Sequence, residues 1–199
     1  MGEIISKEEL NRLMELSGEA RGISLKGELD FILSDQGKDG VEKIEKLTSD
    51  LGHPIKYEKI KTMDFYPLGL EGIILLGARR ILGYNDEKFQ EMGKFESKTS
   101  IIVKLFMKYF YSVEKLIKKV SEMWGKSCTV GEFKIIEHSK EKSFAILRLE
   151  KFELVPGHCQ NLRGYLSGVV QMVVGSSVVC EETKCTFRGD EYHEFLVKW

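Results

Sequence analysis

Apolar residues in the first two-thirds of the chain recur every three or four positions, which is the spacing of one face of a helix. Ser6, followed three residues later by Glu9, fits a capping box that opens the first helix. Two further helices are expected over about residues 24–34 and 41–52, with a break between them at residues 37–40. This part of the chain is therefore predicted to be helical.

Denser apolar stretches follow in the middle of the chain. Residues 67–82 are predicted to form a largely buried helix because of the length and density of their apolar run. The next helix is expected to start at Asn85. Residues 101–124 carry apolar side chains at spacings of three and four, which predicts one long helix that stops at Gly125.

The pattern changes in the last third of the chain. β-Branched and aromatic residues with partial alternation predict strands over residues 128–138 and 143–154, joined as a hairpin by a charged turn. Residues 159–174 predict a helix, and two more strands are expected over residues 176–187 and 191–198. The simplest arrangement is an α+β fold. In it, a four-stranded antiparallel sheet in β-β-α-β-β order carries one helix across a face, with the N-terminal helices packed nearby.

We expect a single domain over residues 1–199, with a helical half of about residues 1–125 and a β-β-α-β-β half of about residues 126–199. Within the C-terminal helix, Gly164 and Gly168 are four residues apart. Because two small residues on one helix face allow a close approach, this spacing predicts that the helix packs tightly on the sheet.

The charge balance and the apolar runs narrow the classes of function. The chain has 30 basic and 31 acidic residues, which gives no electrostatic reason to expect nucleic-acid binding. Its apolar runs are far too short to span a bilayer, so stable membrane insertion is not expected. The N-terminus lacks the apolar core of a secretory signal, and we expect a cytoplasmic protein with reduced thiols. The four cysteines are then expected to be buried, reactive or metal-bound.

Cysteine and histidine residues crowd into the end of the chain, and thiolate, imidazole and carboxylate groups are the usual ligands of zinc. The crowded positions are His158 and Cys159 at a predicted helix start, Cys180, Glu181, Glu182 and Cys185 on the penultimate strand, and His193 on the last strand. The N-terminus of the helix is expected to favour the thiolate form of Cys159, which is the form that binds metal. A thiolate-rich metal site, most simply zinc, is one interpretation of this crowding.

The register of the last hairpin decides whether these side chains can meet. A three-residue loop around Gly189 would place Cys185 directly across from His193, with Cβ atoms about 4.5–5.5 Å apart. A slip of one residue would put the two side chains on opposite faces of the sheet. The alternative interpretation is that the cysteines simply fill space in the core and that the polar residues of the hairpin are solvated. The residues by themselves leave both interpretations open.

The stretch from Val179 to Phe195 resembles the C-terminal signature of the 4-vinyl reductase domain family. That signature is approximately Glu-x-x-Cys, then Gly-Asp, then a second cysteine followed by an aromatic residue. The matching positions in this chain are Glu182 and Cys185 for the first part and Gly189-Asp190 for the turn, with His193 where the second cysteine is expected. The histidine is a departure from the pattern, although a chemically mild one, since histidine is also a zinc ligand.

The resemblance implies a set of metal ligands. Related sensor domains of aromatic-catabolism regulators bind zinc through those three positions and an upstream cysteine, and Cys159 lies at the expected place. The ligand set implied by the resemblance is therefore Cys159, Glu182, Cys185 and His193. Since four protein ligands leave no open position for water, such a zinc site is structural and not catalytic.

The wider superfamily, which this chain resembles in layout, includes haem-dependent nitric-oxide and oxygen sensors and the small subunits of the TRAPP vesicle-tethering complex. The haem sensors ligate iron through a histidine on a mid-chain helix, whereas residues 54–137 of this chain contain no histidine. Their Tyr-x-Ser-x-Arg motif is also missing. Haem is therefore not expected, and a haem-binding gas sensor with Cys128 as the iron ligand stays an alternative.

The functional prediction is a non-enzymatic sensor or carrier that binds a small apolar molecule between the helices and the sheet. The apolar and aromatic side chains of the middle helices are the candidate pocket, and the residues singled out are Phe106, Tyr109, Phe110 and Val113. The alternative for each of them is an ordinary place in the core. A second function class is a protein–protein module, either a homodimer or an adaptor resembling the TRAPP subunits. An enzyme is less expected, because the chain has neither a nucleotide-binding glycine loop after a strand nor a convincing triad.

Overall fold

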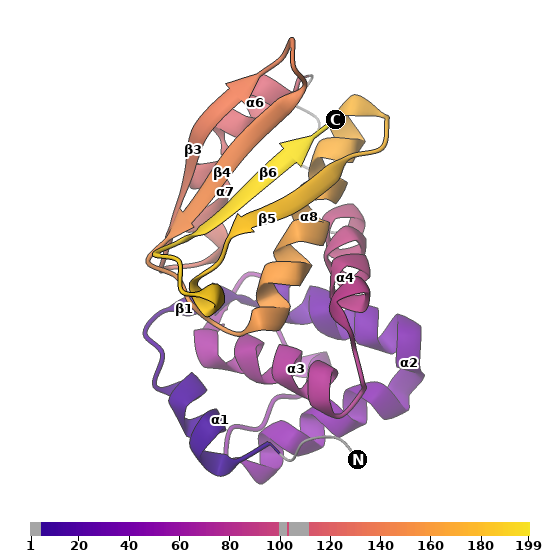
Figure 1. The fold of residues 1–199 in the computed structure, drawn as a ribbon. Helices are drawn as coiled ribbons and strands as arrows, with labels where there is room; N and C mark the ends of the chain where they lie inside the picture. Colours follow the sequence, from indigo (N-terminus) through magenta and orange to yellow (C-terminus); the bar gives the residue numbers. More distant parts are fainter. Residues whose placement is uncertain (1–4, 100–102, 104–111) are drawn as a thin grey trace.

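The computed structural model describes residues 5–99, 103 and 112–199. It confirms the predicted α+β class, with a mainly helical N-terminal half and a C-terminal half built on a four-stranded antiparallel sheet (Figure 1). The described residues contain seven α-helices: α1 (Lys7–Met14), α2 (Gly22–Asp50), α3 (Leu68–Arg80), α4 (Asp86–Thr99), α6 (Val113–Lys118), α7 (Val120–Ser127) and α8 (Pro156–Val174). Two short 3-10 helices are η1 (Tyr57–Lys59) and η2 (Thr186–Arg188).

The large sheet has the strand order β3-β4-β6-β5, and every neighbouring pair is antiparallel. Its strands are β3 (Glu132–Ser139), β4 (Phe144–Glu150), β5 (Val179–Lys184) and β6 (His193–Lys198). With α8 between the two hairpins, this is the predicted β-β-α-β-β order. A second, two-stranded sheet of β1 (Glu19–Arg21) and β2 (Phe65–Pro67) lies in the helical half, and the sequence pattern did not predict it.

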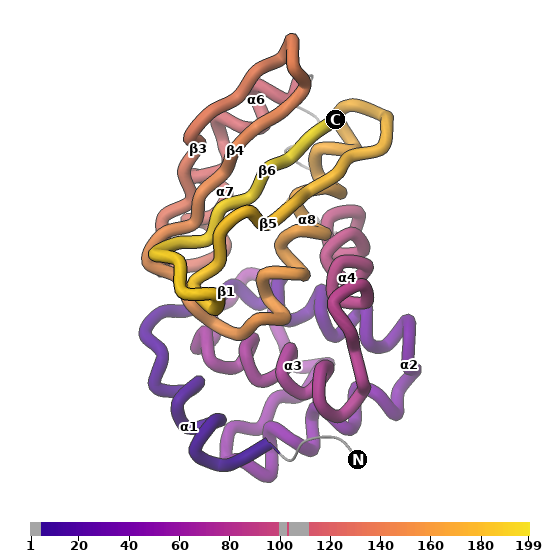
Figure 2. The backbone as a smooth tube through the Cα atoms, viewed as in Figure 1, coloured from indigo at the N-terminus to yellow at the C-terminus, as the bar shows by residue number. Residues whose placement is uncertain are grey.

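Helices cover one face of the large sheet. α6 and α7 lie behind β3 and β4, and α8 lies behind β5 and β6 (Figures 1 and 2). The alternation of β4 follows from this layering, since Ala145, Leu147 and Leu149 are buried and the residues between them are partly exposed. Among the described residues, no helix has the length and apolar character needed to cross a membrane.

The N-terminal helices begin and break where the sequence predicts. Ser6 is the N-cap of α1, and its hydroxyl accepts a hydrogen bond of 3.2 Å from the backbone N–H of Glu9. α2 contains the expected break at Gly37, whose φ of 70° lies in the left-handed region that favours glycine. Every residue of α3 from Leu68 to Ala78 is buried, which confirms the prediction of a buried helix.

The prediction of one long helix over residues 101–124 is wrong where the chain is described. Ser112 has an extended backbone and caps a new helix, α6, by accepting a hydrogen bond of 3.4 Å from the N–H of Lys115. α7 then continues past Gly125 to Ser127, so Gly125 is not a stop. Apolar spacing did not reveal this break, because Ser112 supplies a local hydrogen bond that competes with helix continuation.

The glycines of α8 pack against a different partner from the one predicted. A Cβ atom at Gly164 would lie 2.0 Å from the carbonyl oxygen of Gln90, and one at Gly93 would lie 1.9 Å from the carbonyl oxygen of Asn161. Gly168 similarly abuts α4. The close approach predicted from the glycine spacing is therefore made to α4, and the prediction that the glycines face the sheet is wrong.

Candidate metal centre and pocket

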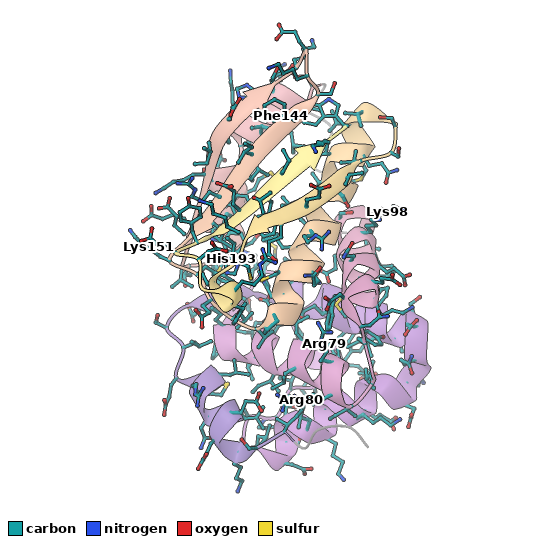
Figure 3. The ribbon with its side chains drawn as sticks, viewed as in Figure 1. Arg79, Arg80, Lys98, Phe144, Lys151 and His193 are labelled. Carbon is teal, nitrogen blue, oxygen red and sulfur yellow. The ribbon has the colours of Figure 1, made fainter. Side chains whose placement is uncertain are left out.

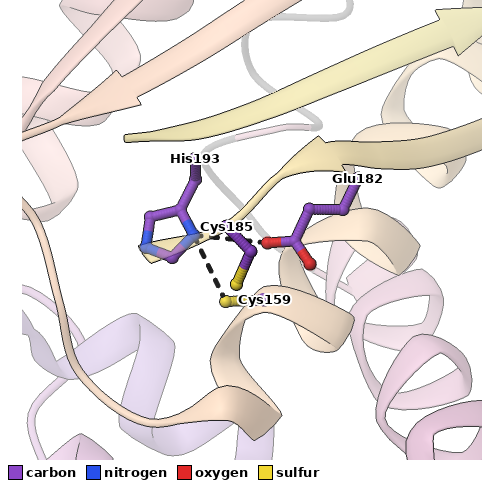
Figure 4. Close-up of side chains that lie close together, drawn as sticks. All are labelled: Cys159, Glu182, Cys185 and His193. Carbon is purple, nitrogen blue, oxygen red and sulfur yellow. Dashed lines mark hydrogen bonds and ion pairs between the residues drawn. The ribbon is translucent and has the colours of Figure 1, made fainter. Parts of the chain in front are cut away.

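Four predicted ligands meet at one end of the sheet. Cys159 comes from α8, Glu182 from β5, Cys185 from the residue after β5 and His193 from the start of β6 (Figure 4). Each offers one potential ligand atom, and these atoms all lie within 4.8 Å of one another. His193 lies at the lower end of the sheet in Figure 3, next to the helical half. We call these four residues the four-ligand cluster; it is the only group of this kind in the part of the chain that the structure describes.

The four-ligand cluster is almost completely shielded from solvent. Cys159 is 3% exposed, Cys185 is 4% exposed and His193 is 2% exposed. The side chain of Glu182 is also 2% exposed, although parts of its backbone are not covered. Burial of two thiols, an imidazole and a carboxyl group together is unusual, because polar groups removed from water need partners.

A β-bulge puts two of the ligands on the same face of β5. Residues three apart on a regular strand point to opposite faces, so Glu182 and Cys185 would be separated. Glu182 pairs with Phe195 whereas Lys184 pairs with Glu194, and this shift in register absorbs one residue. Both side chains therefore face the helices, as His193 does.

The connection between β5 and β6 is longer than the three-residue loop expected from the sequence. It runs from residue 185 to residue 192 and contains the 3-10 helix η2. Gly189 ends η2 in a left-handed conformation with φ of 92°. Asp190 then accepts a hydrogen bond of 2.8 Å from the backbone N–H of Cys185 through Oδ2. The Gly-Asp turn thus fixes Cys185 at the end of its strand.

The ring of His193 is held between the cluster and a hydroxyl group. Its Nδ1 lies 3.6 Å from Cys159 Sγ and 3.2 Å from Glu182 Oε1 (Figure 4). Its Nε2 lies 3.1 Å from Thr186 Oγ1. Metal-binding histidines usually donate their second ring N–H to an outer partner that fixes the ring, and Thr186 occupies that place. Thr186 was not singled out from the sequence, because no spacing rule marks an outer-shell hydroxyl.

Two of the separations between ligand atoms, both from the ring of His193, are close to those of a tetrahedral zinc site. Zinc bonds of about 2.3 Å to sulfur and about 2.1 Å to nitrogen or oxygen, at tetrahedral angles, put sulfur and nitrogen about 3.6 Å apart. The same bonds put nitrogen and oxygen about 3.4 Å apart. The corresponding separations here are 3.6 Å from Cys159 to His193 and 3.2 Å from His193 to Glu182. The donor types and their spacing therefore both fit zinc.

In the absence of a metal, the thiols and the carboxyl group of the four-ligand cluster have pKa values shifted in opposite directions. Burial, together with the negative charge of Glu182, raises the pKa of both Cys159 and Cys185, so both are thiols at neutral pH. Burial would also raise the pKa of Glu182, but hydrogen bonds from His193 and the two thiols outweigh it and lower that pKa. Arg188 Nη1 lies 3.3 Å from Glu182 Oε2 and adds a positive charge.

The expected effect of the helix N-terminus on Cys159 is not found. α8 begins at Pro156, three residues earlier than predicted, so Cys159 is its fourth residue and lies beyond the unbonded N–H groups. Burial instead dominates and raises the pKa of the thiol. Two other candidates lie outside the cluster. Cys180 is buried elsewhere, with its pKa raised by burial to about 12, and His158 faces away from the cluster toward a cavity.

That cavity has a volume of about 250 Å³ and lies between the helices and the sheet, where the apolar pocket was predicted. Its apolar lining among the described residues comes from helices on several sides and from both strands of the first hairpin: Ile23, Leu68, Leu116, Ile117, Val120, Met123, Trp124, Phe133, Leu147, Phe152, Leu162, Leu166, Val169 and Val170. Three of the predicted pocket residues, Phe106, Tyr109 and Phe110, lie outside the described residues. The fourth, Val113, is buried but is not part of this lining, to which the next turn contributes Leu116 and Ile117.

One part of the pocket lining is acidic. Glu71 and Glu96 line the cavity, and Glu28 is buried close enough to both for their charges to interact. Burial raises the pKa of Glu71 to about 7 and that of Glu96 to about 8, and burial with the charges of both neighbours raises the pKa of Glu28. We call these three residues the acid cluster. Sequence analysis missed it, although Glu71 inside the dense apolar run of α3 was a visible signal.

His158 and Asn161 bring α8 to the acid cluster. Asn161 Nδ2 donates a hydrogen bond of 2.8 Å to Glu96 Oε1. His158 Nε2 lies 3.7 Å from Glu71 Oε1, which is longer than a hydrogen bond. The His158 ring packs against Phe152, with centroids 4.9 Å apart, and burial lowers the pKa of the imidazole to about 3. The histidine is therefore neutral at physiological pH.

Comparison with solved structures identifies similar folds. An H-NOX protein from S. oneidensis in the Fe(II)NO ligation state matches with a TM-score of 0.66 and 13% identity, over 89% of this chain and 98% of that one. An unliganded Fe(II) H-NOX protein from K. algicida matches with a TM-score of 0.64 and 12% identity, over 89% of this chain and 95% of that one. At such low identity these likenesses show the fold alone, which is that of the H-NOX proteins.

A subunit 3 of the trafficking protein particle complex from Naegleria fowleri, covalently bound to palmitic acid, matches 65% of this chain and 92% of its own length, at 16% identity. Its TM-score of 0.49 is too low to support an inference about this protein. No protein-family model matches the sequence, and no curated protein matches it. The resemblance to the 4-vinyl reductase domain family therefore stays a prediction.

Proposed function

We propose that this protein is a sensor or carrier that binds a small molecule in its internal pocket, and that a structural zinc ion cross-links its C-terminal half. The observation that carries the zinc proposal is the meeting of four buried donor atoms within 4.8 Å of one another. The resemblance of residues 179–195 to the 4-vinyl reductase domain signature supports the same assignment. The role of the pocket is supported by its position between helices and sheet and by its largely apolar lining.

Zinc is the metal that best suits the donor set. Two thiolates, one imidazole and one carboxylate are ligands that zinc accepts together, and soft thiolate ligands disfavour magnesium and calcium. Two thiolates and a carboxylate around Zn²⁺ carry a net charge of about −1. Arg188 lies beside Glu182 and offsets that charge.

A zinc ion in this place would have a structural role. All four positions of the tetrahedron would be filled by protein atoms, so no position remains for a water molecule or a substrate. The ion would join Cys159 on α8 to Cys185 and His193 on the last hairpin, which are far apart in the sequence. Zinc binding would thus stabilise the contact between the helix and the sheet that encloses the pocket.

The described pocket lining does not suit a haem. A haem carries two anionic propionates, and the acid cluster would oppose them with Glu71 and Glu96. His158 is the only histidine in the described lining, and aromatic rings and Glu71 already surround it. An absorption spectrum of the purified protein tests this part of the proposal, since a haem band would contradict it.

Metal content tests the zinc assignment. We expect one zinc per chain in the purified protein by elemental analysis, and loss of that zinc with a lower melting temperature in Cys185→Ser. Cys180→Ser is the matched control, because Cys180 is equally buried but lies outside the four-ligand cluster, and it should retain its zinc. Unchanged zinc content in Cys185→Ser would refute the assignment.

Ligand binding tests the sensor or carrier assignment separately. A thermal-shift screen of the zinc-loaded protein with small aromatic and branched aliphatic molecules should yield stabilising compounds, because a ligand that binds only the folded state raises its stability. The volume of about 250 Å³ is slightly below the range of about 300–1,000 Å³ for drug-sized ligands, so small molecules should bind best. Failure of every apolar compound to stabilise the protein would count against this function.

A further inference from the structure

The acid cluster joins three helices at the pocket. Glu28 lies on α2, Glu71 on α3 and Glu96 on α4, and the three side chains are close enough for their charges to interact. Glu71 and Glu96 both face the cavity. Three carboxyl groups beside a largely apolar pocket are costly to bury, because each loses its hydration and repels the others when ionised. Packing alone gives no reason for this arrangement.

The acid cluster has fewer hydrogen-bond donors than its carboxyl groups can accept from. Glu28 is only 2% exposed, and its Oε2 is buried without a hydrogen-bond partner. His158 Nε2 stands 3.7 Å from Glu71 Oε1, beyond hydrogen-bond length, while Asn161 donates to Glu96. Buried acceptors are nearly always paired with donors in folded proteins. Glu28 is not part of the cavity lining, but Glu71 is, and its nearest polar neighbour is too far away to donate a hydrogen bond. A buried carboxyl group in the cavity wall without a donor is one that a ligand can complete.

The acid cluster differs from a metal site and suits an ammonium group. The oxygens of the acid cluster form no group of metal-ligand size within the described residues, whereas the four-ligand cluster does. An ammonium group, by contrast, donates three hydrogen bonds and carries the charge that neighbouring carboxylates require. The rest of the lining is largely apolar, including Trp124 and Phe152.

We infer that the pocket selects a small amphiphilic amine, whose ammonium group binds between Glu71 and Glu96, close to Glu28, while its apolar body fills the space beside Trp124 and Phe152. This inference rests on the proposed function, namely that the pocket binds a small molecule. It adds the chemical class of that molecule and the end of the pocket at which its polar group lies.

The other charged residues of the described lining are already engaged. Lys26 Nζ donates a hydrogen bond of 3.0 Å to the carbonyl oxygen of Tyr57, and it also lies over the Tyr57 ring. Asp30 accepts a hydrogen bond of 2.5 Å from the hydroxyl of Tyr57. These two residues therefore pair with the η1 segment, and His158 is kept neutral by burial. The described lining therefore offers the acid cluster no free positive charge, and a ligand can supply it.

Binding of an amine by this route releases protons. With the pKa of Glu71 at about 7 and that of Glu96 at about 8, carboxyl groups of the empty pocket hold protons at neutral pH. An ammonium ion enters with its proton, and a neighbouring carboxylic acid then ionises and gives its own proton to water. Amine affinity should therefore rise between about pH 6 and about pH 8, in the range where these carboxyl groups lose their protons.

Three probes with the same phenyl body test the inference by calorimetry on the zinc-loaded protein. Phenethylamine is protonated at neutral pH, phenethyl alcohol is neutral, and hydrocinnamate is an anion. We expect phenethylamine to bind at least about tenfold more tightly than the alcohol, with proton release, and hydrocinnamate to bind more weakly than either. Equal or tighter binding of the alcohol would overturn the amine inference and leave the apolar pocket in place. No binding by any probe would overturn both.

Variants locate the amine within the pocket. Glu96→Gln and Glu71→Gln keep the size of each side chain but remove its negative charge, and each should bring phenethylamine to within about threefold of phenethyl alcohol. Alcohol binding should stay unchanged, which also shows that the variant folds. Glu87→Gln is the control, since Glu87 is exposed near the start of α4, and it should keep the preference. An undiminished preference for the amine in both acid-cluster variants would overturn the inference.

Discussion

Consecutive residues at the start of α8 face two different buried polar clusters. Cys159 belongs to the four-ligand cluster, in which His193 contacts Cys159, Glu182 and Thr186. His158 faces the acid cluster, where Glu28 Oε2 has no partner. The comparison teaches that this fold buries two polar clusters side by side, at different scales. One has the spacing of a metal ion, and the other borders a cavity that can admit a molecule.

The two clusters should also respond to pH in opposite directions. Zinc binding requires that two thiols whose pKa values are raised lose their protons, so a higher pH favours the loaded four-ligand cluster. The pKa of Glu71 is raised above its ordinary value, so Glu71 contributes stability below about pH 4.5. That contribution is lost as the pH rises through about 7. A higher pH therefore weakens the empty acid cluster.

Of the changes that distinguish the two clusters, removal of the metal should have the largest effect on the free energy of unfolding. A chelator that strips the four-ligand cluster should lower the free energy of unfolding by about 4 kcal/mol, relative to protein at a free zinc concentration about 1,000 times Kd. Urea unfolding with and without the chelator measures the difference. Cys185→Ser lacks one member of the four-ligand cluster, so the chelator should cause no such loss in that variant. An equal loss in that variant would place the metal elsewhere.

The pH dependence of zinc affinity should be the next largest effect. Two thiols lose protons on binding, whereas the pKa of Glu182 is already lowered, so the zinc Kd should increase about 100-fold for each unit that the pH falls below neutral. Competition with a chromophoric chelator at several pH values measures the slope. A Kd independent of pH would show that the thiols are not ligands.

Glu71→Gln should alter the acid cluster and leave the four-ligand cluster unchanged. With zinc saturating, the wild-type protein should lose about 2 kcal/mol of stability relative to this variant between about pH 5 and about pH 8, because only the wild type must ionise the buried carboxyl group of Glu71. Denaturant unfolding across that range gives the difference. The stability difference between the wild type and the control Glu87→Gln should not change over this pH range. If the stability of the wild type and that of Glu71→Gln change with pH in parallel, the prediction is wrong.

Thr186→Val should have the smallest effect of the four. It removes the oxygen beside His193 Nε2 while leaving every ligand in place, so zinc affinity should fall by about tenfold. Thr183→Val is a suitable control, because Thr183 hydrogen-bonds Glu194 outside the four-ligand cluster. If both variants bind zinc equally well, the proposed outer-shell role of Thr186 is wrong.

Much of the fold could be predicted because its signals are local. The Ser6 cap, the break at Gly37 and the buried α3 each depend on side chains within a few residues of one another. The β-β-α-β-β order of elements in the C-terminal half also followed from alternation and turn residues, whereas the spatial strand order β3-β4-β6-β5 was not predicted. Where a local hydrogen bond opposed the apolar spacing, as at Ser112, the spacing alone predicted the wrong element.

The sequence by itself determined which residues are candidates for the metal site, since Cys159, Glu182, Cys185 and His193 are recognisable as zinc-type donors. Only the tertiary structure decided that they meet, because the β5 bulge and the approach of α8 depend on contacts between distant segments. The acid cluster as a group was also decided by the tertiary structure. Glu71 stands out in the sequence only because apolar residues surround it, and Glu28 and Glu96 are unremarkable among 31 acidic residues. Their shared burial beside one cavity is a property of the packed helices.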